Sequence, residues 1–144
     1  MTTYRASLLH DPASGAWTIT FPDFGWGVSQ GQSLLHALEM ARELLHELLA
    51  HLIRRDEPIP TPRKHPGRLF HSVHLPPFES AKVELYRALK ASGLRKAELA
   101  RRLGIPRANV NRLFDLDHAT RFELLEAAFL ALGKRLVIAV EDAA

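Results

Sequence analysis

Hydrophobic and polar residues alternate at the start of the chain in the pattern of two β-strands. Residues 3–9 and 17–21 suit strands, and residues 11–15 between them (Asp-Pro-Ala-Ser-Gly) form a turn cluster. Residues 22–31 contain too many glycines for a helix, and those glycines allow a bend before a short third strand. The pattern therefore predicts a β-hairpin followed by a short third strand.

A long amphipathic helix is predicted from Ser33 to about Ile53. Its leucines and alanines recur at helical spacing, and the glutamates lie on the opposite side together with Arg42. A broad apolar stripe is usually buried, so we expect this helix to lie across the sheet. Four prolines in residues 56–66 end the helix and prevent another from starting.

The second half begins with a strand and continues with helices. Residues 69–75 alternate in the manner of a strand, and residues 79–92 are amphipathic and end at Gly93, a residue suited to a helix C-terminus. The final apolar run, residues 136–140, is typical of a strand but has no neighbour in sequence. It needs either the first sheet or a second copy of itself, and we favour a symmetric dimer.

These elements predict an α+β protein with two domains. The first, residues 1–66, has an antiparallel sheet crossed by one long helix and ends in the proline-rich linker. The second, residues 67–144, is helical and ends in a C-terminal strand. The strand predicted over residues 68–75 lies at the boundary and has the option of packing with the N-terminal sheet.

Residues 96–114 have the pattern of a helix-turn-helix. Ala100 is small where two helices would cross closely, Gly104 permits the tight turn, and Pro106 suits the opening of the second helix. The buried faces would be supplied by Leu99, Leu103, Ile105, Val110 and Leu113.

The opposite face of the second helix carries residues that suit DNA recognition. It presents Arg107, Ala108, Asn111 and Arg112, which we predict to face the major groove, with Arg107 and then Arg112 as the leading base readers. Phosphate contacts are predicted for Lys96 and for the neighbouring Arg95, Arg101 and Arg102. The alternative is an ordinary three-helix core whose basic face is only solvated.

Composition indicates a folded protein without thiol chemistry. The 144 residues are 47% hydrophobic and 24% charged, and the absence of cysteine excludes disulfides and cysteine nucleophiles. No segment resembles a signal peptide or a membrane span, so we expect a cytoplasmic protein without membrane contact. Residues 1–60 carry four Lys/Arg against seven Asp/Glu, whereas residues 61–144 carry fifteen against nine. This contrast suggests two surfaces with different partners.

Enzymatic and metal-binding functions find little support. Asp11 lies in a turn, Asp23 stands almost alone after a strand, and the helical glutamates share one solvated face. The histidines lack metal-ligand spacing, because those of the long helix are not four residues apart and His71 and His74 would point to opposite faces of a strand. We therefore expect no catalytic residues, no metal and no cofactor.

Both halves of the chain match one known family in the same order. In the first half the similarity rests on Ile-Thr-Phe-Pro-Asp-Phe (19–24), Val-Ser-Gln-Gly (28–31) and Glu-Pro-Ile-Pro (57–60). In the second half it rests on residues 97–104, 112–120 and 131–136. The chain resembles the HicB-type antitoxins of bacterial HicA/HicB toxin–antitoxin pairs, in the variant with a C-terminal helix-turn-helix. It departs from them at Gly25-Trp26-Gly27.

The resemblance implies two functions, each with its own binding partner. A partial ribonuclease-H-like N-terminal domain would bind and block a small basic mRNA-cleaving toxin, and the C-terminal domain would repress the shared operon as a homodimer or tetramer. The toxin-binding candidates are Asp11, Asp23, Phe24, Trp26, Glu39 and Glu43. Trp26 is either an interface anchor or part of the core. The alternative function is a plain helix-turn-helix repressor whose N-terminal domain oligomerises or senses a ligand.

Overall fold

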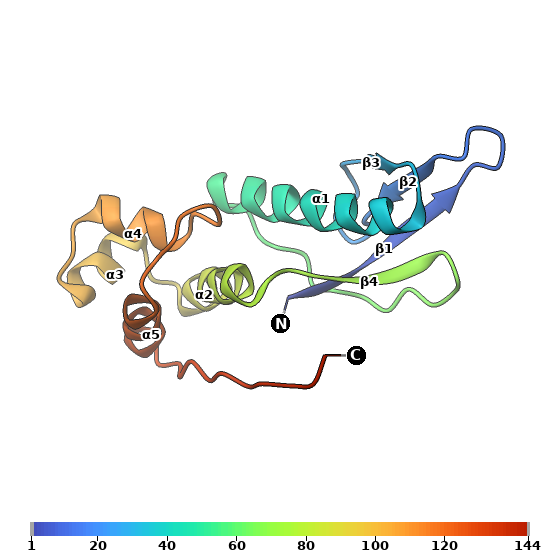
Figure 1. Cartoon of the computed structure of the whole chain (residues 1–144). Helices are drawn as coiled ribbons and strands as arrows, with labels where there is room; N and C mark the ends of the chain where they lie inside the picture. The colour runs from blue at the N-terminus through green and yellow to red at the C-terminus, as the bar shows by residue number, and fades with distance from the viewer. Residues whose placement is uncertain (1, 144) are drawn as a thin grey trace.

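The sheet lies at one end of the molecule and the helices α3, α4 and α5 at the other in the computed structural model, which describes residues 2–143 (Figure 1). Within these residues the sheet has four strands: β1 (Thr3–His10), β2 (Trp17–Thr20), β3 (Ser29–Gly31) and β4 (Phe70–His74). The same residues form five helices: α1 (Leu34–Arg54), α2 (Pro77–Ser92), α3 (Lys96–Leu103), α4 (Arg107–Leu113) and α5 (Phe122–Ala131). The α+β class is confirmed.

The sheet is antiparallel, with the strand order β3-β2-β1-β4. The predicted hairpin is confirmed, since β1 and β2 pair with Ser7 opposite Thr20. Tyr4, Ala6 and Leu8 of β1 are buried while the residues between them are partly exposed, as the two-residue period of a strand requires. One face of the sheet is therefore apolar and is covered by α1.

Helix α1 begins at its N-cap Ser33, whose hydroxyl accepts a hydrogen bond from the backbone N–H of His36 at 3.1 Å. Its buried positions include Ala37, Ala41 and Leu45, so the predicted apolar stripe is confirmed. The start of the helix approaches β3 closely. A Cβ atom on Gly31 would lie 2.6 Å from the backbone N and Cα of Ala37, so only glycine fits there.

The proline-rich segment, residues 55–69 and here called the strap, returns the chain from α1 to the sheet. The Tyr4 hydroxyl donates to the carbonyl of Pro60 at 2.5 Å, and the Tyr86 hydroxyl donates to that of Glu57 at 2.6 Å. The strap then leads into β4, which pairs with β1 and places Val73 opposite Tyr4. The strap is thus packed against the first sheet, and the strand after it completes that sheet.

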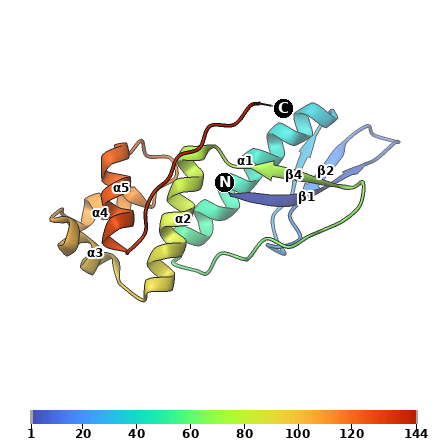
Figure 2. The ribbon, with the colours of Figure 1, turned by 90° about the horizontal axis from the view of Figure 1, so that it is seen from below.

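Helices α3, α4 and α5 gather beyond α2 at the far end of the molecule (Figure 2). Leu99, Val110, Leu125 and Phe129 are buried there, and they belong to the same apolar cluster as the residues beneath the sheet. The ribonuclease-H-like character of the sheet and the division at residue 66 stay predictions. Across residues 2–143 no helix combines the length and apolar character that crossing a membrane requires.

The predicted C-terminal strand is wrong for the single chain. Residues 136–140 form no strand. Leu136 is half-buried against the core, but Val137, Ile138 and Val140 face solvent, with exposed fractions of 73%, 68% and 94%. A strand is defined by its ladder of backbone hydrogen bonds, and no element of the described chain pairs with this run. In Figure 2 it extends past α2 on its own.

Candidate functional site

Two short helices and the turn between them, here called the α3–turn–α4 unit, span residues 96–113. Gly104 ends α3 with φ 65°, a left-handed conformation that glycine adopts without strain, and the N–H of Ile105 donates to the carbonyl of Ala100 at 3.1 Å. Leu99, Val110 and Leu113 are each 0% exposed, as their spacing predicts. Leu103 and Ile105, also predicted to be buried, are half-buried.

The outward face of α4 is open to solvent. Arg107, Ala108, Asn111 and Arg112 are all exposed, and they are the four residues for which major-groove contact is predicted. Arg95, which precedes α3, is exposed as well. The side of α4 that would meet a ligand thus carries two guanidinium groups and one amide, all hydrogen-bond donors suited to base edges and phosphates.

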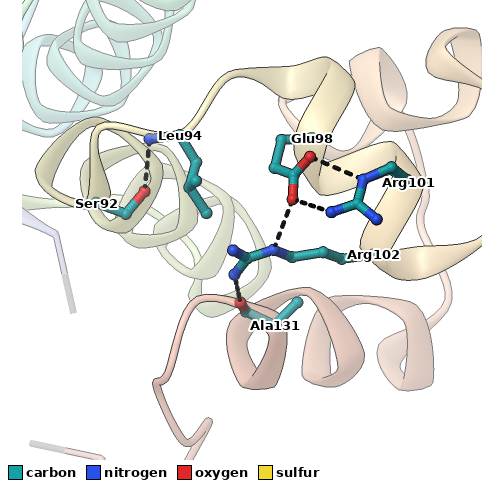
Figure 3. A network of polar contacts seen from close by, with 6 residues as sticks. All are labelled: Ser92, Leu94, Glu98, Arg101, Arg102 and Ala131. Carbon is teal, nitrogen blue, oxygen red and sulfur yellow. Dashed lines mark hydrogen bonds and ion pairs between the residues drawn. The ribbon is translucent and has the colours of Figure 1, made fainter.

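A polar network joins α3 to α5 (Figure 3). The Glu98 carboxylate accepts two hydrogen bonds from Arg101, at 2.9 and 2.5 Å, and one from Arg102 at 3.2 Å. These hydrogen bonds lower the pKa of Glu98 to about 2. Arg102 also donates to the carbonyl of Ala131 at 3.1 Å. Arg101 therefore shares its charge with Glu98, and Arg102 serves the packing of α5.

Lys96 lies deeper than a surface phosphate contact would. Its ammonium sits 5.3 Å from the centre of the Phe114 ring, and burial lowers its pKa while nearby Asp56 opposes the shift. Lys96 and Asn111 line a groove of about 520 Å³ whose opposite wall includes Arg54 at the end of α1. The long helix of the first sheet therefore ends beside α4, which the sequence pattern does not indicate.

Lys82 on α2 is a residue that the sequence analysis missed. It is fully buried, and its ammonium donates to the carbonyls of Arg112, Asp115 and His118 at 2.9, 2.7 and 2.5 Å. These carbonyls belong to the end of α4 and the turn after it. Helical periodicity could have indicated its burial, because Lys82 shares the buried face of α2 with Leu85 and Leu89.

Two of the predicted toxin-binding carboxylates make contacts within the chain. The Asp23 side chain is 2% exposed and accepts hydrogen bonds from the backbone of Arg63 at 3.1 Å and from the ring of His65 at 2.8 Å. It therefore anchors the strap and points inward. Asp11 is exposed and closes the β1–β2 turn by accepting from Ser14, which lowers the pKa of its carboxyl group.

Trp26 lies at the edge of an open groove of about 310 Å³ between the β2–β3 loop, α1 and the strap. Its side chain packs edge-on against His51 and remains 45% exposed, so it is both packed and accessible. Phe24 lies in the same groove, half-buried against Tyr4. The other lining residues are Asp23, Leu52, Pro58, Ile59 and Pro60.

Three of the seven acids in residues 1–60 lie on one face of α1. Glu39 and Glu43 are exposed on α1, at four-residue spacing with Glu47. Residues 61–75, which the fold adds to the first sheet, bring three Lys/Arg and no acid, so residues 1–75 carry seven Lys/Arg against seven Asp/Glu. The charge contrast between halves therefore does not describe the folded sheet as a whole.

A family model described as "HicB_like antitoxin of bacterial toxin-antitoxin system" matches residues 3–84, more than half of the chain. The chain belongs to the HicB-like antitoxin family. "Antitoxin HicB" of Escherichia coli (strain K12) is 32% identical over 133 residues, covering 92% of this chain and 95% of the relative. "Antitoxin HicB" of Pseudomonas fluorescens (strain Pf0-1) is 37% identical over 78% of this chain and 77% of the relative.

A solved "Toxin-Antitoxin complex from Streptococcus pneumoniae" contains a chain that aligns with a TM-score of 0.46 and 21% identity, covering 76% of this chain and 93% of that one. The HicB-like match runs from β1 into α2, through the position at which the sequence predicts a domain boundary. The E. coli alignment is long enough to include the α3–turn–α4 unit as well. Residues 2–143 contain no cluster of three or more side chains placed to hold a metal ion.

Proposed function

We propose that this HicB-family chain is an antitoxin that neutralises a HicA-type mRNA-cleaving toxin and represses its own operon. Toxin binding is assigned to the first sheet with α1, and sequence-specific operator binding to the α3–turn–α4 unit acting as a helix-turn-helix. The observation that carries the proposal is the match to proteins named Antitoxin HicB over as much as 92% of the chain, because this length includes both parts.

Operator recognition is supported by the exposed face of α4. Arg107 and Arg112 can pair with guanine and Asn111 with adenine, while Ala108 leaves room for a close approach to the groove. Arg95 is free to reach phosphates, and Lys96 and Arg101 contribute positive charge beside their internal contacts. Residues 61–144 carry fifteen Lys/Arg against nine Asp/Glu, which suits a polyanion.

Toxin binding is supported by an apolar anchor and by a row of acids. Trp26 and Phe24 offer apolar surface in the groove beside the strap, and exposed Glu39 and Glu43 provide negative charge along α1. Interfaces commonly combine an aromatic anchor with charges that steer a partner of opposite sign. Asp11 adds an exposed charge at the hairpin tip, whereas Asp23 contributes by holding the strap.

A homodimer, alone or as half of a tetramer, completes the proposal. Residues 136–140 expose an apolar run whose backbone is free to pair with the same run of a second copy. Such pairing would join two α3–turn–α4 units by a two-fold axis. Paired units would then read operator half-sites about 34–36 Å apart, one turn of the DNA helix, or a multiple of that distance.

The first experiment tests toxin neutralisation with the full chain. It is co-expressed with the small protein encoded beside it, the complex is purified, and mRNA cleavage by that protein is measured with and without the antitoxin. We expect a stable complex and loss of cleavage. Reversing Glu39 and Glu43 to arginine should slow association, most strongly at low salt, whereas the same reversal of Glu123 and Glu126 on α5 should not.

The second experiment measures footprints on the promoter of the chain's own operon. Protection of two symmetric half-sites is expected. If the promoter is protected but no complex forms with any neighbouring gene product, the chain is a plain repressor whose first sheet has another task. If neither the promoter nor a toxin is bound, both parts of the proposal fail.

A further inference from the structure

His46 lies where three elements of the molecule meet. It projects from α1, and its side chain is 16% exposed. Its Nδ1 lies 2.9 Å from a carboxylate oxygen of Glu79 on α2, and its Nε2 lies 2.9 Å from a carboxylate oxygen of Asp117 in the turn between α4 and α5. One imidazole ring therefore bridges two carboxylates on separate elements.

The number of protons on this ring decides whether both contacts are attractive. A neutral imidazole has one N–H donor, and its second nitrogen carries a lone pair. A carboxylate has only acceptors, so a neutral ring would donate to one carboxylate and repel the other. Only the imidazolium form donates to both Glu79 and Asp117, and both bonds are then charge-assisted.

The turn that carries Asp117 also determines where α4 lies. Lys82 of α2 binds this turn and the end of α4 by donating hydrogen bonds to the carbonyls of Arg112, Asp115 and His118. The bond from His46 to Asp117 joins α1 to this turn. The end of α4 is therefore fixed to α2 by a lysine and to α1 by a histidine.

We propose that His46 is a positioning residue: in its imidazolium form it holds α4 at a fixed position relative to α1, and loss of its proton loosens that position. The consequence for DNA rests on the operator binding proposed above. The positioning itself is a property of the free protein and is testable without DNA.

The charged groups facing His46 set the direction of its titration. Burial lowers the pKa of His46. The hydrogen bond and charge of Glu79 and the charges of Asp117 and Glu47 together raise it by more, so the net pKa is raised. Lys82 approaches the same turn from α2. A raised folded pKa means that the link is complete below the unfolded value of about 6.5 and is lost as pH rises through the folded value.

The test is an NMR titration of the full chain that follows the ring resonances of all histidines and the backbone amides of α4. We expect His46 to titrate above the ordinary histidine value of about 6.5, because its pKa is raised by the carboxylates that face it. The amides of Asn111 to Leu113 should shift with the midpoint of His46. The proposal is overturned if His46 titrates at or below the ordinary histidine value of about 6.5, or if these amides follow another midpoint.

An Asp117→Asn variant separates positioning from simple packing. The asparagine amide can donate to the lone pair of a neutral ring, so the link to α1 survives at high pH. The α4 shifts should then become independent of pH, while a His51→Gln control retains the wild-type profile. A pH profile unchanged by Asp117→Asn would contradict the proposal.

Operator binding provides the functional readout. In the wild type, operator affinity should fall by about fivefold or more as His46 deprotonates, the lower end of the usual coupling between two sites, and in Asp117→Asn it should stay level. A level wild-type profile alongside intact binding would overturn the positioning role and leave the proposed function standing. Absence of any operator binding would instead count against the proposed function, and the NMR arm would still decide the role of His46.

Discussion

Among single residues, Lys82 is unusual because its buried charge is surrounded by carbonyl oxygens. Helix α4 leaves its last carbonyls without partners, as every helix does, and the Lys82 ammonium donates to one of them and to two in the turn beyond. Burial lowers the pKa of Lys82 to about 8, so the side chain is mostly charged at neutral pH. The lysine thus acts as a cap supplied from another helix.

Replacing Lys82 by methionine should destabilise the protein. Methionine fills similar space but has no donor, so three carbonyls lose a charge-assisted partner, at a cost of about 2–4 kcal/mol in unfolding free energy. Urea denaturation at pH 7 measures the loss. The matched control is Lys90→Met on the same helix, where a partly exposed pair with Asp56 is worth about 0–1 kcal/mol. Equal losses in both variants would contradict the capping role.

The stability difference between wild type and Lys82→Met should also depend on pH. The folded pKa of Lys82, about 8, lies below its usual value of 10.5, so the unfolded chain binds more protons between these values. Stability contributed by this site therefore rises with pH over that window. Urea midpoints at several pH values between 8 and 10 should show that the stability of the wild type increases relative to that of the methionine variant as pH rises. A constant or shrinking difference would mean that the lysine pKa is not lowered.

Residue burial was predictable from the sequence where it followed periodicity, and residue pairing was not. Leu99, Val110 and Leu113 were identified because helical spacing places them on one face. The partners of Asp23 and Lys82 were not predicted, because they lie 30 to 42 residues away and become neighbours only in the fold. A carboxylate that anchors a strap and one that binds a partner look the same in a sequence.

At the scale of elements, α4 is the part whose surface the sequence describes best. Its seven residues alternate between the core and solvent with a helical period, so the exposed set follows from the buried one. The prediction of a strand at residues 136–140 was wrong because it depends on more than the local pattern. Strand formation depends on a neighbour that the sequence does not specify, and the single chain supplies none for residues 136–140.

Substitutions on α4 and just before α3 should have different effects on DNA binding. Arg107→Ala removes a predicted base contact, so operator affinity should fall by about 1–3 kcal/mol and specificity should relax at one position. Arg95→Ala should weaken operator and random DNA alike and reduce the salt slope by about one. Lys96→Ala is a less clean control, because it also removes the contact with the Phe114 ring. Titrations on operator and scrambled DNA at several salt concentrations distinguish these outcomes.

At the scale of the whole molecule, α1 spans the distance between the two candidate surfaces. In Figure 1 it runs from β3 toward the helices at the far end. It carries the exposed glutamates along its length, and Arg54 at its end lines the same groove as Asn111. Buried residues form one continuous cluster from the sheet to α5. The surfaces proposed for toxin binding and for DNA binding therefore share one hydrophobic core. Helix α1 carries part of the first surface and ends beside α4, which carries the second.

Assembly should depend on the C-terminal run. Ile138→Pro removes a backbone donor and prevents a ladder, but the residue is 68% exposed, so the fold of the single chain should be preserved. Light scattering after gel filtration should show the dimer mass halved, with operator affinity reduced in parallel. Ala143→Pro, beyond the apolar run, should leave the mass unchanged. A dimer that survives Ile138→Pro would place the interface elsewhere.

The position of β4 also determines when the protein becomes functional during its synthesis. Strand β1 leaves the ribosome before α1 and the strap, yet one of its two neighbours, β4, is encoded about seventy residues later. At about 5–20 residues per second, several seconds separate the two strands. During that interval the nascent chain has an open edge on β1, and the proposed toxin-binding surface is complete only after residues 70–74 have emerged.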